Sequence, residues 1–234
     1  MRNKIKTFLK FLVLNSILFP NISSSQTNTN YDFIPVLPEL YNKKVKEFRS
    51  ENISEGSIFF VGNSIIEGGN WKKLLNNNKI INRGIGGDIT YGVLNRLEEI
   101  TTRKPSKVFI LVGINDLSKN IPIAEIIGNY RKIINKLSSS NPDVEIYIHS
   151  LLPVNPHVKN FPSGYEKSKE IFEINERIKE LSKEINIRFI NLFPLFKDNQ
   201  NLLKKELTTD GLHLNAGGYL IWTNFLLNEK IIDN

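Results

Sequence analysis

Short apolar runs alternate with longer amphipathic segments along most of this chain. The stretches 58–61 and 108–112 are wholly hydrophobic, so both faces of the strands that contain them would be apolar. Strands of this kind lie at the centre of a parallel sheet that helices cover on both sides. The pattern therefore predicts an α/β protein with three layers, in which helices sandwich a doubly wound parallel sheet.

The same alternation predicts the order of the elements. Strands are expected at 57–62, 80–82, 107–113, 144–150 and 187–191. Helices are expected at 39–50, 66–76, 89–101, 122–140, 165–185 and 216–227. Because no linker or change of composition interrupts this order, we predict a single domain over residues 26–234.

Four short polar motifs fall at the ends of predicted strands or just before the last helix. They are Gly-Asn-Ser at 62–64, a glycine-rich turn at 84–88, Gly-Ile-Asn-Asp at 113–116 and Asp-Gly-Leu-His at 210–213. The carboxyl ends of parallel strands share one edge of the sheet, and ligands bind there in doubly wound folds. We therefore expect the four motifs to converge on one site.

The first and last motifs together contain the residues of a nucleophilic serine site. Asp210 lies three residues before His213, a spacing that can set the carboxylate against one ring nitrogen and fix the tautomer. The other nitrogen can then accept the proton of a hydroxyl, and the hydroxyl that fits is that of Ser64. A serine in such a turn, taken alone, is more often an ordinary surface residue, but the fixed order of four motifs favours catalysis.

Attack of a serine on an ester carbonyl places negative charge on the carbonyl oxygen, which needs hydrogen-bond donors. Three donors are in view, namely the backbone N–H groups of Ser64 and Gly87 and the side-chain amide of Asn115. A phosphate-binding role for the glycines at 84–87 is disfavoured, because the turn lacks a P-loop lysine and a dinucleotide fingerprint. Asp116 is expected to cap the helix that follows it.

The four motifs resemble blocks I, II, III and V of the SGNH hydrolases, the GDSL-type esterases and lipases, in the same order. The resemblance extends over residues 57–226 and implies a flavodoxin-like, five-stranded α/β/α sandwich. It also implies roles for five residues: a catalytic triad of Ser64, Asp210 and His213, and an oxyanion hole of Ser64, Gly87 and Asn115.

Within that family, the segments 60–69 and 82–97 look like those of the small acetylhydrolases. These include bacterial carbohydrate O-acetylesterases, such as sialate O-acetylesterases, and the catalytic subunits of platelet-activating factor acetylhydrolase. Asn63 departs from the family's name-giving motif, which has aspartate there. Since the triad acid belongs to the last block, Asn63 should keep a turn-stabilising side-chain hydrogen bond and leave the catalytic assignment intact.

The first 25 residues have the layout of a secretory signal peptide. A basic start is followed by a mostly apolar stretch from 8 to 19 and by small and polar residues up to Ser25. Lys10 and Asn15 interrupt the apolar stretch, which is shorter than the ~20 residues of a membrane-spanning helix. We therefore expect a signal peptide at 1–25, an exported protein that is periplasmic or extracellular, and no stable membrane insertion after cleavage.

Charge and residue usage exclude several classes of function. The formal net charge of +7 falls to +3 without residues 1–25, which hold four basic residues and no acids. The remaining lysines are interleaved with glutamates, as in 166–184, so we expect solvated helix faces and no nucleic-acid partner.

The chain has no cysteine, which excludes disulfides and thiolate sites. His149 and His157 are expected to be a hydrogen-bonded structural residue and a surface or pocket-rim residue, and we expect no metal and no organic cofactor.

A triad of this kind specifies acyl transfer to water but not the acyl group. No lid, long apolar flap or exposed hydrophobic helix is evident, so we expect a small acyl ester, acetyl above all, of a small molecule or glycan. The alternatives are a lysophospholipase or thioesterase that acts on longer acyl chains, and a noncatalytic glycan-binding module. Phe161 and Tyr165 are candidates for substrate contact, whereas Trp71 is expected in the core.

Overall fold

The computed structural model describes residues 35–232 of the chain. The expected signal peptide at 1–25 lies outside these residues. One parallel sheet contains the strands β1 (Ile58–Gly62), β2 (Ile80–Gly84), β3 (Lys107–Leu111), β4 (Glu145–His149) and β5 (Arg188–Ile190). Their order, β2-β1-β3-β4-β5, is the flavodoxin-like order. β2 is added on one side of β1 and β3 on the other, so the topological switch point lies between β1 and β3. The predicted doubly wound sheet is confirmed.

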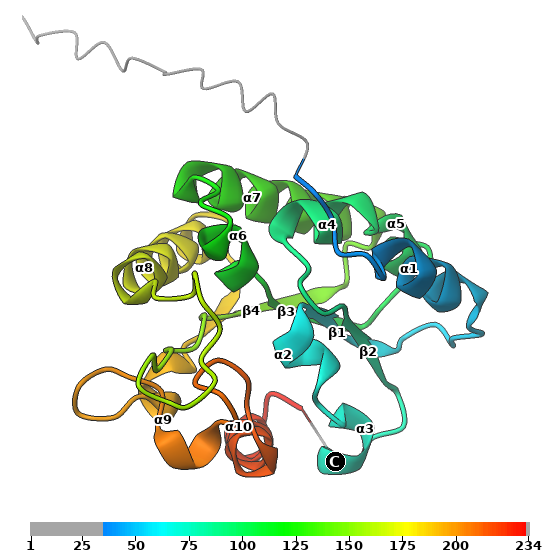
Figure 1. Cartoon of the computed structure of the whole chain (residues 1–234). Coiled ribbons are helices and arrows are strands. Elements are labelled where there is room, and N and C mark those ends of the chain that lie inside the picture. Colours follow the sequence, from blue (N-terminus) through cyan, green and yellow to red (C-terminus); the bar gives the residue numbers. More distant parts are fainter. Residues whose placement is uncertain (1–34, 233–234) are drawn as a thin grey trace, which may run out of the picture. The chain divides into compact units, whose positions relative to one another are not determined.

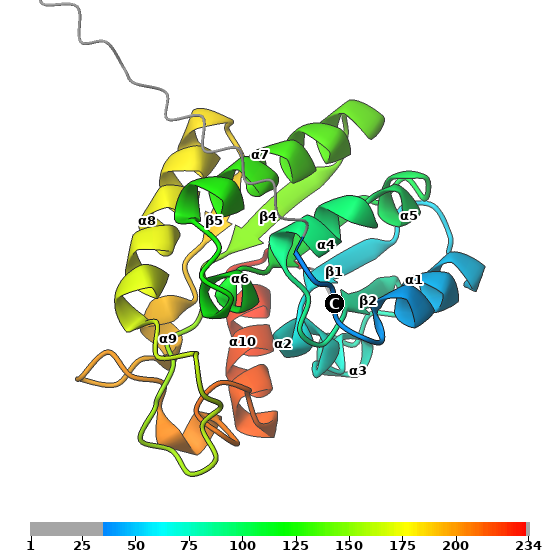
Figure 2. The ribbon, with the colours of Figure 1, turned by 45° about the horizontal axis from the view of Figure 1, so that its top comes forward.

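Helices cover both faces of the sheet (Figure 1). One face carries α1 (Tyr41–Ser50), α4 (Thr90–Asn95), α5 (Glu98–Thr101), α7 (Ile123–Ser140) and α8 (Ser168–Glu184). The other face carries α3 (Trp71–Leu74), α9 (Phe193–Phe196) and α10 (Ala216–Asn228). Two short helices, α2 (Ser64–Glu67) and α6 (Ile114–Ser118), follow β1 and β3, and a 3₁₀ turn spans Lys205–Leu207. Figure 2 shows α7 between α4 and α8, against both of which it packs.

A row of stacked rings joins the sheet to α3 and α10. Phe60, Phe109 and Tyr147 are register partners on β1, β3 and β4, and their neighbouring ring centroids lie 4.7 and 4.6 Å apart. Trp71 stacks on Phe60 at 4.4 Å and meets Trp222 edge-on at 4.9 Å. Each such pair contributes about 0.5–1.5 kcal/mol beyond the burial of the rings. The predicted core position of Trp71 is confirmed, since the residue is buried.

The helix predicted over 66–76 is interrupted by the sequence Gly-Gly-Asn at 68–70. It forms two short helices instead, α2 and α3. At Gly69 a Cβ atom would come within 2.3 Å of the Trp71 ring, so the close approach of the chain to that ring requires a glycine. The break lets the indole turn back onto the sheet, where its Nε1 donates to the carbonyl of Ile66 at 2.8 Å.

Other boundaries also differ from the prediction. The helix expected over 89–101 is divided into α4 and α5. The helix expected over 165–185 begins at Ser168, because the N–H of Lys167 donates to the carbonyl of Tyr165 at 2.7 Å in a tight turn. The short helices α6 and α9 were not predicted, since four or five residues are too few to show a helical period.

Candidate active site

Ser64 and Asn115 both lie just beyond the carboxyl ends of central strands. Ser64 is the first residue of α2, which follows β1, and Asn115 lies in the first turn of α6, which follows β3. The side chain of Asn63 caps α2, because its Oδ1 accepts a hydrogen bond from the N–H of Ile65 at 3.0 Å. This is the turn-stabilising hydrogen bond that the sequence analysis expects of Asn63.

The side chains of Ser64, His213 and Asp210 form one hydrogen-bonded chain. The Oγ of Ser64 lies 2.9 Å from Nε2 of His213, and Nδ1 of the same ring lies 2.7 Å from Oδ2 of Asp210. The second carboxylate oxygen of Asp210 accepts the backbone N–H groups of His213 at 2.8 Å and Leu212 at 3.0 Å. With the Nδ1 proton directed at the carboxylate, Nε2 is the nitrogen that can accept the serine proton.

The loop around Asp210 keeps its carboxylate charged. Partial burial raises the pKa of Asp210, but the hydrogen bonds from His213 and from the backbone of Leu212 outweigh it, and the pKa lies below its ordinary value. A charged carboxylate stabilises the imidazolium that forms when His213 takes up a proton. Gly211 has a φ of +87°, and a Cβ there would lie within 2.2 Å of the carbonyl oxygen of Asn155. Glycine is therefore required in this turn.

The glycine-rich turn at 84–88 packs against the helix that Ser64 begins. A Cβ at Gly84 would come within 2.1 Å of the backbone nitrogen of Glu67 in α2, so the two segments are in direct contact. Gly87 has a φ of +75°, a conformation that side chains other than hydrogen strongly disfavour. Glycines at 84 and 87 therefore allow the turn to lie directly against α2, the helix that Ser64 begins.

Asn115 is tied to the same turn. Its Nδ2 donates to the carbonyl oxygen of Asp88 at 2.8 Å, and its Oδ1 accepts the hydroxyl of Tyr165 at 2.8 Å. The residue is only 3% exposed. The structure therefore brings the residues predicted from the sequence together at the carboxyl edge of the sheet, in two hydrogen-bonded groups. One group is Ser64, His213 and Asp210, and the other is Asn115 with the glycine-rich turn.

A buried ion pair links the glycine-rich turn at 84–88 to the ends of β1 and β2. Asp88 Oδ2 lies 3.0 Å from Nε of Arg96, and both side chains are buried. Arg96 Nη2 also donates to the carbonyls of Arg83 at 2.8 Å and Gly62 at 3.2 Å, where β2 and β1 end. Burial raises the pKa of Asp88 to about 6, against the opposing effect of the Arg96 charge. The sequence analysis missed Arg96. Its partners lie in the glycine-rich turn and near the ends of β1 and β2, and nothing in the sequence around Arg96 indicates these distant contacts.

Asp116 does not cap the helix that follows it, and that prediction is wrong. It lies inside α6, and its carboxylate accepts hydrogen bonds from the backbone N–H and the hydroxyl of Thr90. Thr90 is the first residue of α4, so Asp116 caps a helix that lies earlier in the chain. Asn129 donates to the hydroxyl of Thr90 at 3.0 Å, which joins α7 to this network. Burial raises the pKa of Asp116 to about 6.

His149 is structural, but it is not hydrogen-bonded as predicted. Its ring is buried between Phe109 and Trp222, with centroids at 5.7 and 5.0 Å, and neither ring nitrogen has a hydrogen-bond partner within residues 35–232. Burial lowers the pKa of His149 to about 3, so the ring is neutral. His157 is exposed, in agreement with a surface position. Neither residue belongs to the triad.

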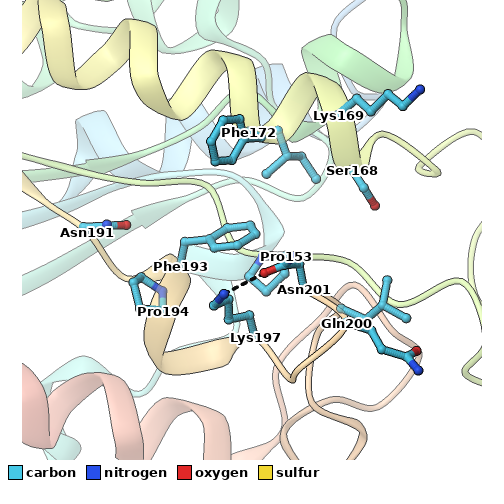
Figure 3. Close-up of a pocket in the computed structure, with 12 residues that line it drawn as sticks. Pro153, Ser168, Lys169, Phe172, Asn191, Phe193, Pro194, Lys197, Gln200 and Asn201 are labelled. Carbon is cyan, nitrogen blue, oxygen red and sulfur yellow. Dashed lines mark hydrogen bonds between the residues drawn. The ribbon is translucent and has the colours of Figure 1, made fainter.

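A pocket of about 600 Å³ lies between α8, α9 and the loop that follows α9 (Figure 3). The rings of Phe172 and Phe193 and the side chain of Lys197 line it, but no residue of the triad does. The pocket is therefore separate from the hydrogen-bonded chain of Ser64, His213 and Asp210. In the part of the chain that the structure describes, no three His, Asp or Glu side chains are grouped to hold a metal ion. Over the same residues, 35–232, no helix has the length and apolar character needed to span a bilayer.

A flavodoxin-like sheet with a serine, histidine and aspartate at its carboxyl edge is the arrangement of a serine hydrolase. The model of the GDSL-like lipase/acylhydrolase family matches residues 60–221, a range that includes all four motifs. The chain therefore belongs to this family and is a hydrolase of ester bonds. The resemblance drawn from the motifs is confirmed.

Several relatives are acetylhydrolases by name. The chain is 28% identical over 171 residues to the human platelet-activating factor acetylhydrolase IB subunit alpha2, covering 70% of this chain and 72% of that protein. Among solved structures, a Streptococcus pneumonia protein provisionally named as a platelet activating factor superimposes with a TM-score of 0.74 at 32% identity, covering 81% of this chain and 92% of the other. A GDSL-like lipase from Bacteroides thetaiotaomicron gives a TM-score of 0.69 at 25% identity, with 82% and 98% covered.

Proposed function

We propose that this protein is an exported esterase that removes small acyl groups, acetyl above all, from carbohydrates. The observation that carries the catalytic part is the hydrogen-bonded chain from Ser64 Oγ through His213 to Asp210, with distances of 2.9 and 2.7 Å. In this proposal Ser64 is the nucleophile, His213 is the general base, and Asp210 orients the ring and stabilises its protonated form.

The reaction follows from this geometry. As Ser64 Oγ attacks the ester carbonyl, its proton passes to Nε2 of His213, and the charged ring then donates that proton to the departing alcohol. The backbone N–H groups of Ser64 and Gly87 and the amide of Asn115 bind the negative oxygen of the tetrahedral intermediate. Water, deprotonated by His213, attacks the acyl-serine in the same manner and releases the acid.

Two observations support a small acyl group on a carbohydrate. The human relative named above is an acetylhydrolase subunit by name, so acetyl is the acyl group with the best support. The signal-peptide layout of residues 1–25 favours a substrate outside the cytoplasm, where acetylated glycans are accessible. Cleavage near Ser25 would be tested by fractionating cells that express the full chain and sequencing the amino terminus of the exported form.

Hydrolysis of p-nitrophenyl acetate, butyrate and octanoate tests the acyl preference. We expect acetate to be hydrolysed fastest, the rate to fall steeply with chain length, and activity to vanish in Ser64→Ala. Ser138→Ala, which alters an exposed serine in the last turn of α7, away from the four motifs, is the matched control and should keep full activity. Release of acetate from O-acetylated sialosides and from acetylated xylan then tests which carbohydrate forms the alcohol part of the ester.

The outcomes separate the alternatives. A preference for octanoate would replace the small-acyl proposal with a lysophospholipase or thioesterase. Equal activity in the wild type and in Ser64→Ala would refute the role of Ser64, and if both proteins were inert on all three esters, the noncatalytic glycan-binding module would have to be considered again.

A further inference from the structure

We propose that Tyr165 is a positioning residue for the oxyanion hole, because its hydroxyl fixes the orientation of the Asn115 amide. This inference rests on the proposed function, in which Asn115 donates to the negative oxygen of the tetrahedral intermediate. It assigns a role to a residue that lies 50 positions away in the sequence, on the segment that leads into α8.

The hydrogen bonds of the Asn115 side chain leave one donor available. A side-chain amide has two N–H donors and one carbonyl acceptor. In residues 35–232, one N–H of Asn115 is taken by the carbonyl of Asp88 at 2.8 Å, and the acceptor is taken by Tyr165 at 2.8 Å. With these two contacts made, the second N–H of this buried residue is the donor that can be offered to a substrate oxygen.

The two partners determine which way the amide faces. The carbonyl of Asp88 can only accept a hydrogen bond, so it must face the NH₂ group of Asn115 rather than its oxygen. The hydroxyl of Tyr165 then donates to Oδ1. Without this second contact, the amide would be held by Asp88 alone and could rotate about its terminal torsion, which is intrinsically soft for asparagine. The donor would then spend less time aimed at the substrate.

Tyr165 is itself held against α6. The N–H of Lys167 donates to the Tyr165 carbonyl at 2.7 Å, and Lys167 Nζ donates to Oδ1 of Asn120 at 2.8 Å, just past the end of α6. The phenol is half-buried and packs against the core. The segment around Tyr165 therefore touches α6 near both of its ends, and these contacts deliver the hydroxyl to Asn115.

A double-mutant cycle on the purified full-length protein tests the inference, with p-nitrophenyl acetate as substrate. Tyr165→Phe removes only the hydroxyl and should lower kcat about 3- to 10-fold, the effect of losing one neutral hydrogen bond, with KM changed less than about twofold. Asn115→Ala should lower kcat by about 10²- to 10³-fold. Because Tyr165 acts through Asn115, adding Tyr165→Phe to Asn115→Ala should lower kcat no further.

Tyr147→Phe is the matched control, because it removes a phenolic hydroxyl that bonds Glu145 and Arg188 away from the motifs, and its kcat should match the wild type. Tyr165→Phe that lowers kcat equally in both backgrounds, or that raises KM alone, would overturn the inference and make the phenol an independent contact. Failure of the proposed function looks different, because then Ser64→Ala would keep the wild-type activity.

Discussion

Acidification should destabilise the folded protein through His149. The imidazole is 0% exposed and its nitrogens have no hydrogen-bond partner within residues 35–232, so burial lowers its pKa from 6.5 to about 3. Because this pKa is lower in the folded chain than in the unfolded chain, the unfolded chain binds the proton first as the pH falls. The stability at neutral pH is therefore progressively lost as the pH falls from 6.5 toward about 3.

The size of the effect follows from the difference between the two pKa values. At about 1.36 kcal/mol per unit, the free energy of unfolding should decrease by about 2 kcal/mol at pH 5 and about 4 kcal/mol at pH 3. Asp88 and Asp116 act in the opposite direction, because burial raises each pKa to about 6 and the folded chain then binds their protons first. The pH dependence of the wild type alone therefore does not isolate His149.

A variant without the titratable ring isolates it. His149→Leu keeps an apolar side chain between Phe109 and Trp222, and urea unfolding followed by circular dichroism gives the free energy of unfolding of both proteins at each pH. The difference, wild type minus variant, should decrease by about 2 kcal/mol between pH 7 and pH 5, whatever its value at pH 7. A difference that stays constant would place the folded-state pKa near the unfolded one, and would refute the absence of a polar partner for the ring.

Two further predictions concern the site and its support. His213→Ala should abolish ester turnover without unfolding the protein, because the variant lacks the group that accepts the serine proton, and turnover at the wild-type rate would contradict the role of His213 as base. Arg96→Met should lower the free energy of unfolding by about 3–5 kcal/mol at pH 7.5, since it leaves the buried Asp88 carboxylate without its cation. This loss, measured by urea unfolding, should shrink at pH 5, where Asp88 takes up a proton, and an equal loss at both pH values would argue against the ion pair.

The architecture was predictable because its signals are local. Strands that are apolar on both faces require cover on both sides, and this alone indicates a parallel sheet with two layers of helices. The site was partly predictable for a related reason, since the ends of parallel strands must meet at one edge. The Asp210–His213 contact is also local, because the two residues lie only three positions apart.

What sequence reasoning missed depends on contacts between distant segments. Asp116 looks like the cap of the helix that follows it, yet its carboxylate caps α4, which begins at Thr90, 26 residues earlier. The sequence gives no sign that the Tyr165 hydroxyl meets Asn115, because the turn that delivers it lies on a segment that resembles the start of a helix. His149 is expected to be a hydrogen-bonded residue, but its ring lies against Phe109 of β3 and Trp222 of α10, and contacts between such distant segments leave no local signal.

The acid–base half of the site is held by its own loop rather than by the sheet. The hydroxyl of Thr208 donates to the carbonyl of His213 at 2.6 Å and accepts the N–H of Gly211 at 2.8 Å, while the N–H of Asn155 donates to the Gly211 carbonyl at 2.8 Å. These bonds close the turn around Asp210 through contacts within the protein itself. This loop therefore preorganises the imidazole of His213 between Ser64 and Asp210, the arrangement in which Nε2 can accept a proton.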